Sequence, residues 1–121
     1  MLTKDQIELI ETLAGLTTSN KIVWSKYLTP TMFFYRKLDK MYIINNYKTS
    51  TGGGNELYDC YSLTVIDNQG RPLQNCIGCN DTQFMADYNE IGKLYKAMMV
   101  QYSLSHKDDR ETKNLITELC E

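Results

Sequence analysis

Apolar and polar residues alternate along residues 57–67, and this pattern predicts a β-strand. Successive side chains of a strand point to opposite faces, so the odd-numbered positions share one face, which is the more apolar and which we expect to face the core. Those positions are Leu57, Asp59, Tyr61, Leu63 and Val65. Residues 67–70, with the sequence Asp-Asn-Gln-Gly, favour a hairpin turn. Because Pro72 lacks a backbone N–H, we expect the return strand to be an edge strand or to leave the sheet early.

Near the N-terminus, Thr3 and Gln6 fit a capping box, and the helix that they begin carries an apolar face. That face consists of Ile7, Ile10, Leu13 and Ala14. A longer helix is predicted after a second cap at Asn80 and Gln83, because apolar residues recur there at spacings of three and four. These residues are Phe84, Tyr88, Ile91, Tyr95, Met98 and Tyr102.

The apolar stripe on the long helix has two interpretations. The first is a helix laid across the sheet, with the stripe in the core. The second is an interaction surface, either a dimer seam or a contact with a partner's groove. In the second case the interface residues are Tyr88, Tyr95, Met98 and Tyr102.

Three further strands are predicted before the central one, over residues 21–27, 32–37 and 41–48. A short helix follows the long one, with a third capping box at Asp108 and Glu111 and an apolar face of Leu115, Ile116 and Leu119. The chain has 121 residues, the length of one domain, and contains no internal repeat or linker. We therefore expect a single α+β domain over residues 1–121. It consists of an N-terminal helix, an antiparallel meander of four to five strands, a long amphipathic helix and a short C-terminal helix packed on the sheet.

The net charge is −2, so the chain as a whole has no attraction to nucleic acid or to membranes. No apolar run reaches the length of about 20 residues that a membrane span needs, and the first residues are acidic and amphipathic, unlike a signal peptide. We therefore expect a cytoplasmic protein without a membrane or nucleic-acid partner. Positive charge concentrates between Lys21 and Lys48, where six basic residues accompany one acid, Asp39.

The same segment is rich in aromatic residues, a mixture in which rings stack on a base while cations hold phosphates. We predict an anion-binding site there, in which three aromatic residues stack on the ligand and three cations contact a phosphate or a carboxylate. The predicted ligand-binding residues are Trp24, Tyr35, Arg36, Lys37, Lys40 and Tyr42. The alternative is a plain sheet whose aromatic side chains face inward and whose lysines lie in water.

Four cysteines occur in a chain without an export signal, so we expect free thiols rather than a disulfide framework. Cys76 and Cys79 have the Cys-x-x-Cys spacing of zinc and thiol-redox sites. The sequence has no second pair with this spacing. The main interpretation is therefore two ordinary thiols in a loop between strand and helix, with zinc binding and redox chemistry as alternatives.

Residues 52–54 are three consecutive glycines, which predict a flexible loop between strands or a mobile flap over a ligand.

His106 is the one histidine of the sequence, and neither a nucleophile nor an orienting partner lies near it in the chain. Because no hydrolase or cofactor-binding motif occurs, we expect a protein that is not an enzyme and uses no cofactor.

The layout resembles small proteins that are common in phage and bacterial mobile-element genomes. The residues that carry the resemblance are Ile22-x-Trp24, Tyr61-x-Leu63-x-Val65-x-Asp67-x-x-Gly70 and Leu94-Tyr95. Some small phage proteins bind host factors or sequester nucleotide immune signals, so the resemblance implies a phage-encoded inhibitor of host defence. We predict a homo-oligomeric binding protein for an anionic ligand, such as a nucleotide-like one, or for a protein partner. The alternatives are an interaction or inhibitor module that uses the long helix and a zinc or redox domain that uses Cys76 and Cys79.

Overall fold

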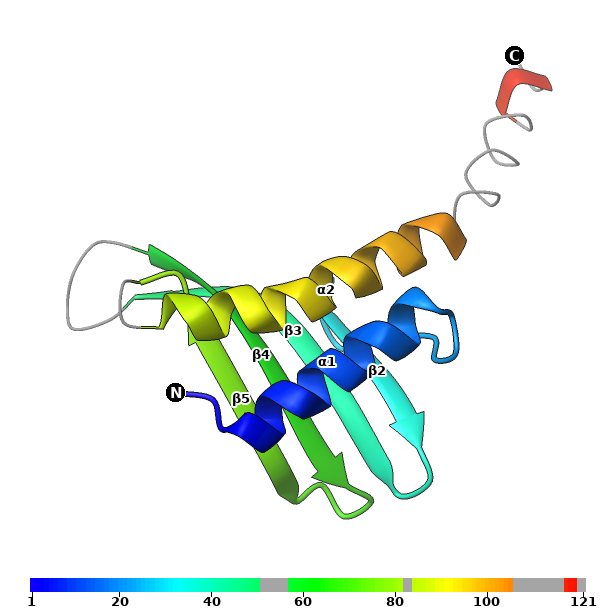
Figure 1. Cartoon of the computed structure of the whole chain (residues 1–121). Helices are drawn as coiled ribbons and strands as arrows, with labels where there is room; N and C mark the ends of the chain where they lie inside the picture. Colours follow the sequence, from blue (N-terminus) through cyan, green and yellow to red (C-terminus); the bar gives the residue numbers. More distant parts are fainter. Residues whose placement is uncertain (51–56, 82–83, 106–116, 120–121) are drawn as a thin grey trace.

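The computed structural model describes residues 1–50, 57–81, 84–105 and 117–119. It contains an N-terminal helix, a sheet of five antiparallel strands and a long helix (Figure 1). In chain order the elements are α1 (Lys4–Thr18), β1 (Ser25–Lys26), β2 (Met32–Lys37), β3 (Lys40–Ser50), β4 (Leu57–Asp67), β5 (Pro72–Cys79) and α2 (Met85–Ser105). The strands lie in the sheet in the order in which they occur in the chain. The predicted α+β fold with an antiparallel meander is confirmed.

Both helices lie on one face of the sheet and contact each other (Figure 1). We call this side the helix face, and we call the other side, which no described element covers, the open face. α1 begins at the predicted capping box, in which the side chains of Thr3 and Gln6 each accept a backbone N–H from the other residue. The arrangement places the hydrophobic core between the helices and the sheet.

The strand predicted over residues 21–27 is much shorter than expected, because only β1 pairs with β2. The backbone N–H of Trp24 donates instead to the Gln101 side chain of α2, at 3.2 Å, which takes this residue out of the sheet. The predicted alternation still holds, since Ile22 and Trp24 are buried and Val23 is exposed.

The turn between β4 and β5 forms as the sequence predicts. The Asp67 carboxylate accepts two backbone N–H groups of the turn, both at 2.9 Å, and Gly70 takes a positive φ of 80°. β5 is an edge strand, as Pro72 predicts. It does not leave the sheet early, because after a bulge near its start it stays paired with β4 as far as Cys79.

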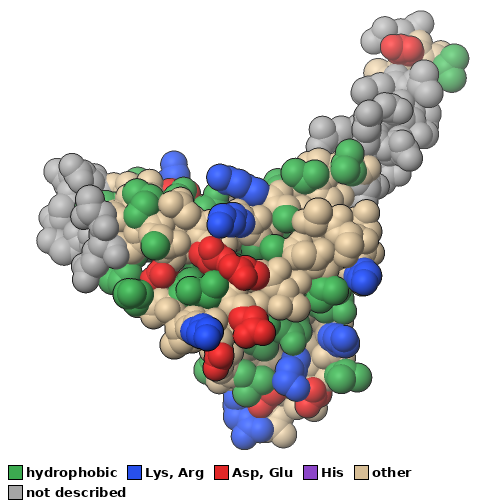
Figure 2. Space-filling view, viewed as in Figure 1, with side chains coloured by type: hydrophobic (Ala, Val, Ile, Leu, Met, Phe, Trp, Pro, Cys, Tyr) green, Lys and Arg blue, Asp and Glu red, His purple; other side chains and the backbone are tan. Residues whose placement is uncertain are grey.

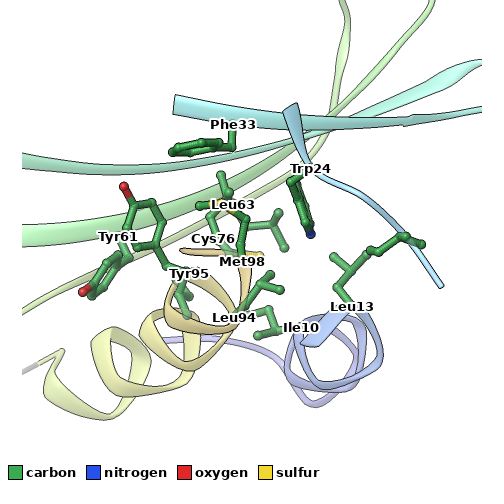
Figure 3. Packing of buried hydrophobic residues seen from close by; sticks show 13 residues of the cluster. Ile10, Leu13, Trp24, Phe33, Tyr61, Leu63, Cys76, Leu94, Tyr95 and Met98 are labelled. Carbon is green, nitrogen blue, oxygen red and sulfur yellow. The ribbon is translucent and has the colours of Figure 1, made fainter. Parts of the chain in front are cut away.

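The core lies between the sheet and the two helices (Figure 3). The odd-numbered positions of β4 face it as predicted: Tyr61, Leu63 and Val65 are buried, whereas Leu57 at the strand end is exposed. α1 contributes Ile10, which is fully buried.

The apolar stripe of α2 belongs to this core. Leu94 and Met98 have no exposed surface, and Tyr95 is 9% exposed. Tyr88 and Tyr102 are half-buried against the same cluster. These positions match a helix laid across the sheet. A dimer seam that needs Met98 and Tyr95 would require both side chains to leave the core.

A buried polar network joins α1, α2 and the segment that precedes β1. The Gln101 Nε2 donates to the backbone carbonyls of Thr17 at 3.2 Å and Ile22 at 2.7 Å. The Trp24 indole donates to Thr17 Oγ1 at 2.9 Å. No buried side-chain nitrogen or oxygen in the described ranges lacks a hydrogen-bond partner. The network therefore fixes the helix pair over the sheet without an uncompensated polar group.

The hydrogen bonds at the start of α2 differ from the predicted cap. Just before the helix starts, the Asp81 carboxylate accepts the N–H of Phe84 at 2.8 Å, whereas Gln83 of the predicted cap lies outside the described residues. The Asn80 side chain accepts the N–H of Asp59 in β4 instead.

Beyond α2, residues 117–119 are helical as predicted, but their side chains are exposed and do not pack on the sheet. Within the described ranges, every helix is too short or too polar to cross a membrane.

Candidate functional site

The six predicted ligand-binding residues do not come together in one site. Adjacent residues of a strand point to opposite faces, so Arg36 points to the open face and Lys37 to the helix face. Tyr35 and Tyr42 pair across β2 and β3 and share the helix face with Lys37. On this side of the molecule, Lys and Arg side chains are scattered among acidic ones and form no continuous patch (Figure 2). The predicted set is therefore split between two places.

The burial of Trp24 excludes the stacking role predicted for it. The side chain is 2% exposed, and its ring lies 6.1 Å from the ring of Tyr35. Alternation places Trp24 on the side that the helices cover, and α1 holds its indole through Thr17. The ring is part of the core and cannot meet a ligand.

Tyr35, Lys37 and Tyr42 line a cleft of about 130 Å³ between α1 and the sheet. The remaining lining residues are Leu9, Thr12, Leu13, Leu16 and Ile22. A cavity of about 150 Å³ holds one benzene ring, so a nucleotide does not fit here. The two tyrosine rings, 6.1 Å apart, are also half-buried against the core cluster, which leaves little of their faces for stacking.

Arg36 lines a second hollow, of about 240 Å³, on the open face, and Lys40 beside the β2–β3 turn also lines it. It lies at the tips of the β2–β3 and β4–β5 hairpins, and we call it the hairpin hollow. Its apolar wall consists of Tyr27, Met41 and Ile66. These three residues could not be grouped from the sequence, because Met41 and Ile66 meet only through the strand register that pairs them.

Most charges around the hairpin hollow are already paired. Asp67 accepts the Arg71 Nε–H at 2.8 Å, and backbone hydrogen bonds, chiefly from Arg71, lower the pKa of the Asp67 carboxyl group. Lys40 Nζ lies 3.3 Å from Asp39. In the part of the chain that the structure describes, Arg36 has no ion-pair partner. Its guanidinium is therefore available to an anion.

The tip of the β2–β3 hairpin carries an exposed leucine in a strained backbone conformation. Leu38 has φ 57° and is 88% exposed. The left-handed conformation costs a residue with a Cβ atom about 1 kcal/mol, and Asn or Gly is preferred at such positions of a two-residue turn. Because Leu38 also lines the hairpin hollow, it adds apolar contact surface at its rim.

A tyrosine cluster lies on the helix face, where α2 begins. The Tyr88 hydroxyl donates to Asp59 Oδ2 at 2.7 Å, and this hydrogen bond raises the pKa of Tyr88 above its ordinary value. Burial raises the pKa of Tyr61 and of Tyr95. Asn46 donates to the other Asp59 oxygen at 3.0 Å. Both oxygens of this carboxylate are therefore engaged within the protein, so it is not a free base.

Cys76 and Cys79 cannot bind one metal ion or exchange a disulfide with each other. Both lie in β5 rather than in the predicted loop, and their spacing of three points them to opposite faces of the strand. Cys79 forms a disulfide with Cys60 of the neighbouring strand β4, with a Cα–Cα distance of 4.1 Å, so the expectation of free thiols is wrong for this pair. Cys76 is free and buried, and burial raises the pKa of its thiol. The described residues contain no cluster of three or more His, Cys, Asp or Glu side chains suited to a metal ion.

Some features that the sequence indicates lie outside the described residues. They are the glycines at residues 52–54, His106, one of the four cysteines (Cys120) and the part of the predicted C-terminal helix before residue 117. The predicted flap and the role of the histidine stay predictions.

Comparisons with family models, curated proteins and solved structures gave no match for this chain. The resemblance to phage and mobile-element proteins therefore stays a prediction.

Proposed function

We propose that the protein is a non-enzymatic binding protein that takes an acidic side chain of a protein partner into the hairpin hollow. The observation that carries this proposal is the guanidinium of Arg36, which lines the hollow and has no ion-pair partner in the described ranges. Next to it lie the apolar side chains of Met41 and Ile66. Arginine binds carboxylates through two parallel hydrogen bonds, so a carboxylate on a short apolar stem, as in glutamate, matches this surface.

The size of the hollow favours a side chain over a whole small ligand. Pockets that enclose small ligands have volumes of about 300–1,000 Å³, whereas the hairpin hollow measures about 240 Å³. A nucleotide-like ligand would leave much of its surface in solvent. A glutamate side chain fits the volume, and the remainder of the partner can lie on the open face.

The surroundings of the hollow supply further contact surface. Leu38 is exposed at the hairpin tip, and Tyr27 and Phe34 lie on the open face with their rings 5.4 Å apart. Aromatic residues and arginine are enriched at the centres of protein interfaces, where they carry much of the binding energy. An aromatic surface beside an unpaired arginine thus supports recognition of a protein.

Nuclear magnetic resonance of the isotope-labelled protein tests the proposal. The probe is N-acetylglutamate amide, the smallest mimic of an acidic side chain in a protein, and N-acetylglutamine amide is its uncharged control. We expect the glutamate probe to shift the signals of Arg36, Met41 and Ile66 in a saturable manner. The glutamine probe should bind at least about tenfold more weakly, which corresponds to about 1.4 kcal/mol.

Adjacent cations supply a matched pair of variants. Arg36→Glu reverses the charge in the hollow, and Lys37→Glu makes the same change on the opposite face of the same strand. We expect the first variant to lose binding and the second to keep it. Binding that persists in Arg36→Glu would remove the site from consideration. AMP that binds tenfold more tightly than the glutamate probe, with the same dependence on Arg36, would reassign the hollow to a small anionic ligand.

A further inference from the structure

The two edges of the sheet differ in charge. At one edge, β1 has two residues, one of them Lys26, and the part of β2 beyond it carries Arg36 and Lys37. Short edge strands and charged side chains are common protections against pairing with another chain. At the other edge, β5 contains no Lys, Arg, Asp or Glu. Pro72 and the bulge hinder pairing with another chain only at the start of β5, so residues 74–79 form an edge that carries no charged side chain.

The hydrogen-bond pattern identifies the backbone groups of β5 that point outward. Asn80 donates its N–H to the carbonyl of Asp59 at 2.9 Å. Hydrogen-bonded and non-hydrogen-bonded pairs alternate in an antiparallel ladder, so the preceding residue, Cys79, belongs to a non-hydrogen-bonded pair. The same alternation directs the N–H and C=O groups of Asn75, Ile77 and Cys79 away from β4. These groups are ready to pair with another strand.

The side chains along this edge are accessible, and contacts with β4 and α2 fix the position of the strand. Gln74 and Asn75 are exposed, and Ile77 is 45% exposed. The disulfide ties Cys79 to β4, and the backbone of α2 packs directly on Gly78. An edge that is already ordered loses little conformational entropy when it pairs.

We infer that β5 pairs in antiparallel orientation with β5 of a second copy, joining the two sheets into one. In a two-fold dimer, residues near the axis meet their own copies, so a charge there would face a like charge. The absence of charge from β5 makes this edge compatible with itself. Pairing centred on Ile77 would place the two isoleucines in contact and set Asn75 opposite Cys79 of the second copy. The inference does not rest on the hairpin hollow, and it moves the expected homo-oligomer contact from the long helix to the sheet edge.

Sedimentation of the full chain at increasing concentration tests the dimer, and we expect a species of twice the 14.0 kDa chain mass. Asn75→Pro removes an outward backbone N–H and no backbone hydrogen bond to β4, although it also removes the bond that Thr64 Oγ1 donates to Asn75 Oδ1 at 3.3 Å. Ile77→Lys places two like charges at the axis. Both variants should be monomeric, and Ile77→Lys should unfold at the same urea concentration as the dissociated wild type. Thr64→Lys adds the same charge to the open face of β4, whose neighbours on both sides are strands, and should stay dimeric.

Amide hydrogen exchange locates the contact. In the dimer, the Asn75 and Ile77 amides should be protected, and their protection should disappear on dilution. The Cys76 and Gly78 amides should stay protected in both states, because they face β4. A wild-type protein that stays monomeric at every concentration would overturn the inference, as would a dimer in which Asn75 and Ile77 exchange freely. Arg36→Glu should remain dimeric, so a failure of the binding proposal can be told apart from a failure of this one.

Discussion

Gly78 lies where the backbone of α2 packs directly on the sheet. A Cβ atom at this position would lie 2.7 Å from Tyr88 Cα, which belongs to a backbone that cannot rotate away. We expect Gly78→Ala to lower the free energy of unfolding by about 3 kcal/mol, because overpacking forces the helix off the strand. Urea denaturation of the variant and the wild type measures the difference.

The chain offers a matched control for this substitution. Gly15 lies in α1, and a Cβ atom there would have no neighbour within 4 Å. Gly15→Ala should raise the free energy of unfolding by about 0.5–1 kcal/mol, because alanine loses less backbone entropy in a helix. If the two alanine variants had equal stability, the close approach at Gly78 would be wrong.

Tyr88 makes the free energy of unfolding depend on pH in the alkaline range. Its hydrogen bond to Asp59 raises the pKa of the phenol in the folded state above the unfolded value of about 10. The stabilisation is therefore complete below about pH 10 and is lost as the pH rises towards the folded-state pKa. We expect this group to lower the free energy of unfolding by up to about 1.4 kcal/mol per pH unit in that range. Tyr88→Phe should remove this part of the slope in urea titrations, and parallel curves for the two proteins would contradict the assignment.

At the scale of elements, the helix pair depends on one buried amide. Gln101 satisfies the N–H of Trp24 and the carbonyls of Thr17 and Ile22. Gln101→Leu would leave the Trp24 N–H and the Ile22 carbonyl without these partners, whereas the Thr17 carbonyl keeps the N–H of Asn20 at 3.0 Å. Each unsatisfied buried group costs about 1–3 kcal/mol. We therefore expect a loss of about 3 kcal/mol or more in thermal or urea unfolding. Val100→Leu, at an exposed neighbouring position, should change stability by less than about 0.5 kcal/mol.

The sequence predicted a loop at residues 76–79, whereas β5 continues to Cys79. Cysteine and glycine at residues 76–79 have no alternation of apolar and polar side chains, so their sequence favours a loop. The glycine is present for another reason, because only a residue without Cβ fits under α2 at position 78. The disulfide follows from strand register, which sets Cys60 opposite Cys79, and that register is not contained in the spacing of the cysteines.

For the whole molecule, the fold could be predicted from the sequence because its signals are local. The capping box at Thr3, the turn at residues 67–70 and the odd-numbered face of β4 each depend on residues close together in the chain. The candidate site could not be predicted in the same way. Arg36 and Lys37 are neighbours in the sequence but lie on opposite faces, and only the placement of both helices on one side decides which of them meets an open surface.

The compartment of the protein is a further property that depends on the whole molecule. The cytoplasmic location expected from the sequence stays a prediction. The Cys60–Cys79 disulfide counts against it, because structural disulfides are rare in reducing compartments.

The order of the strands has a consequence for how the chain folds. Each strand pairs with the strand next to it in the chain, so the sheet can form one hairpin after another with short loop closures. The helices α1 and α2 stand at opposite ends of this series, yet they pack against each other. We therefore expect the contact between α1 and α2 to form late in folding. Weakening this contact should speed unfolding and leave the folding rate nearly unchanged, which stopped-flow kinetics in urea would measure.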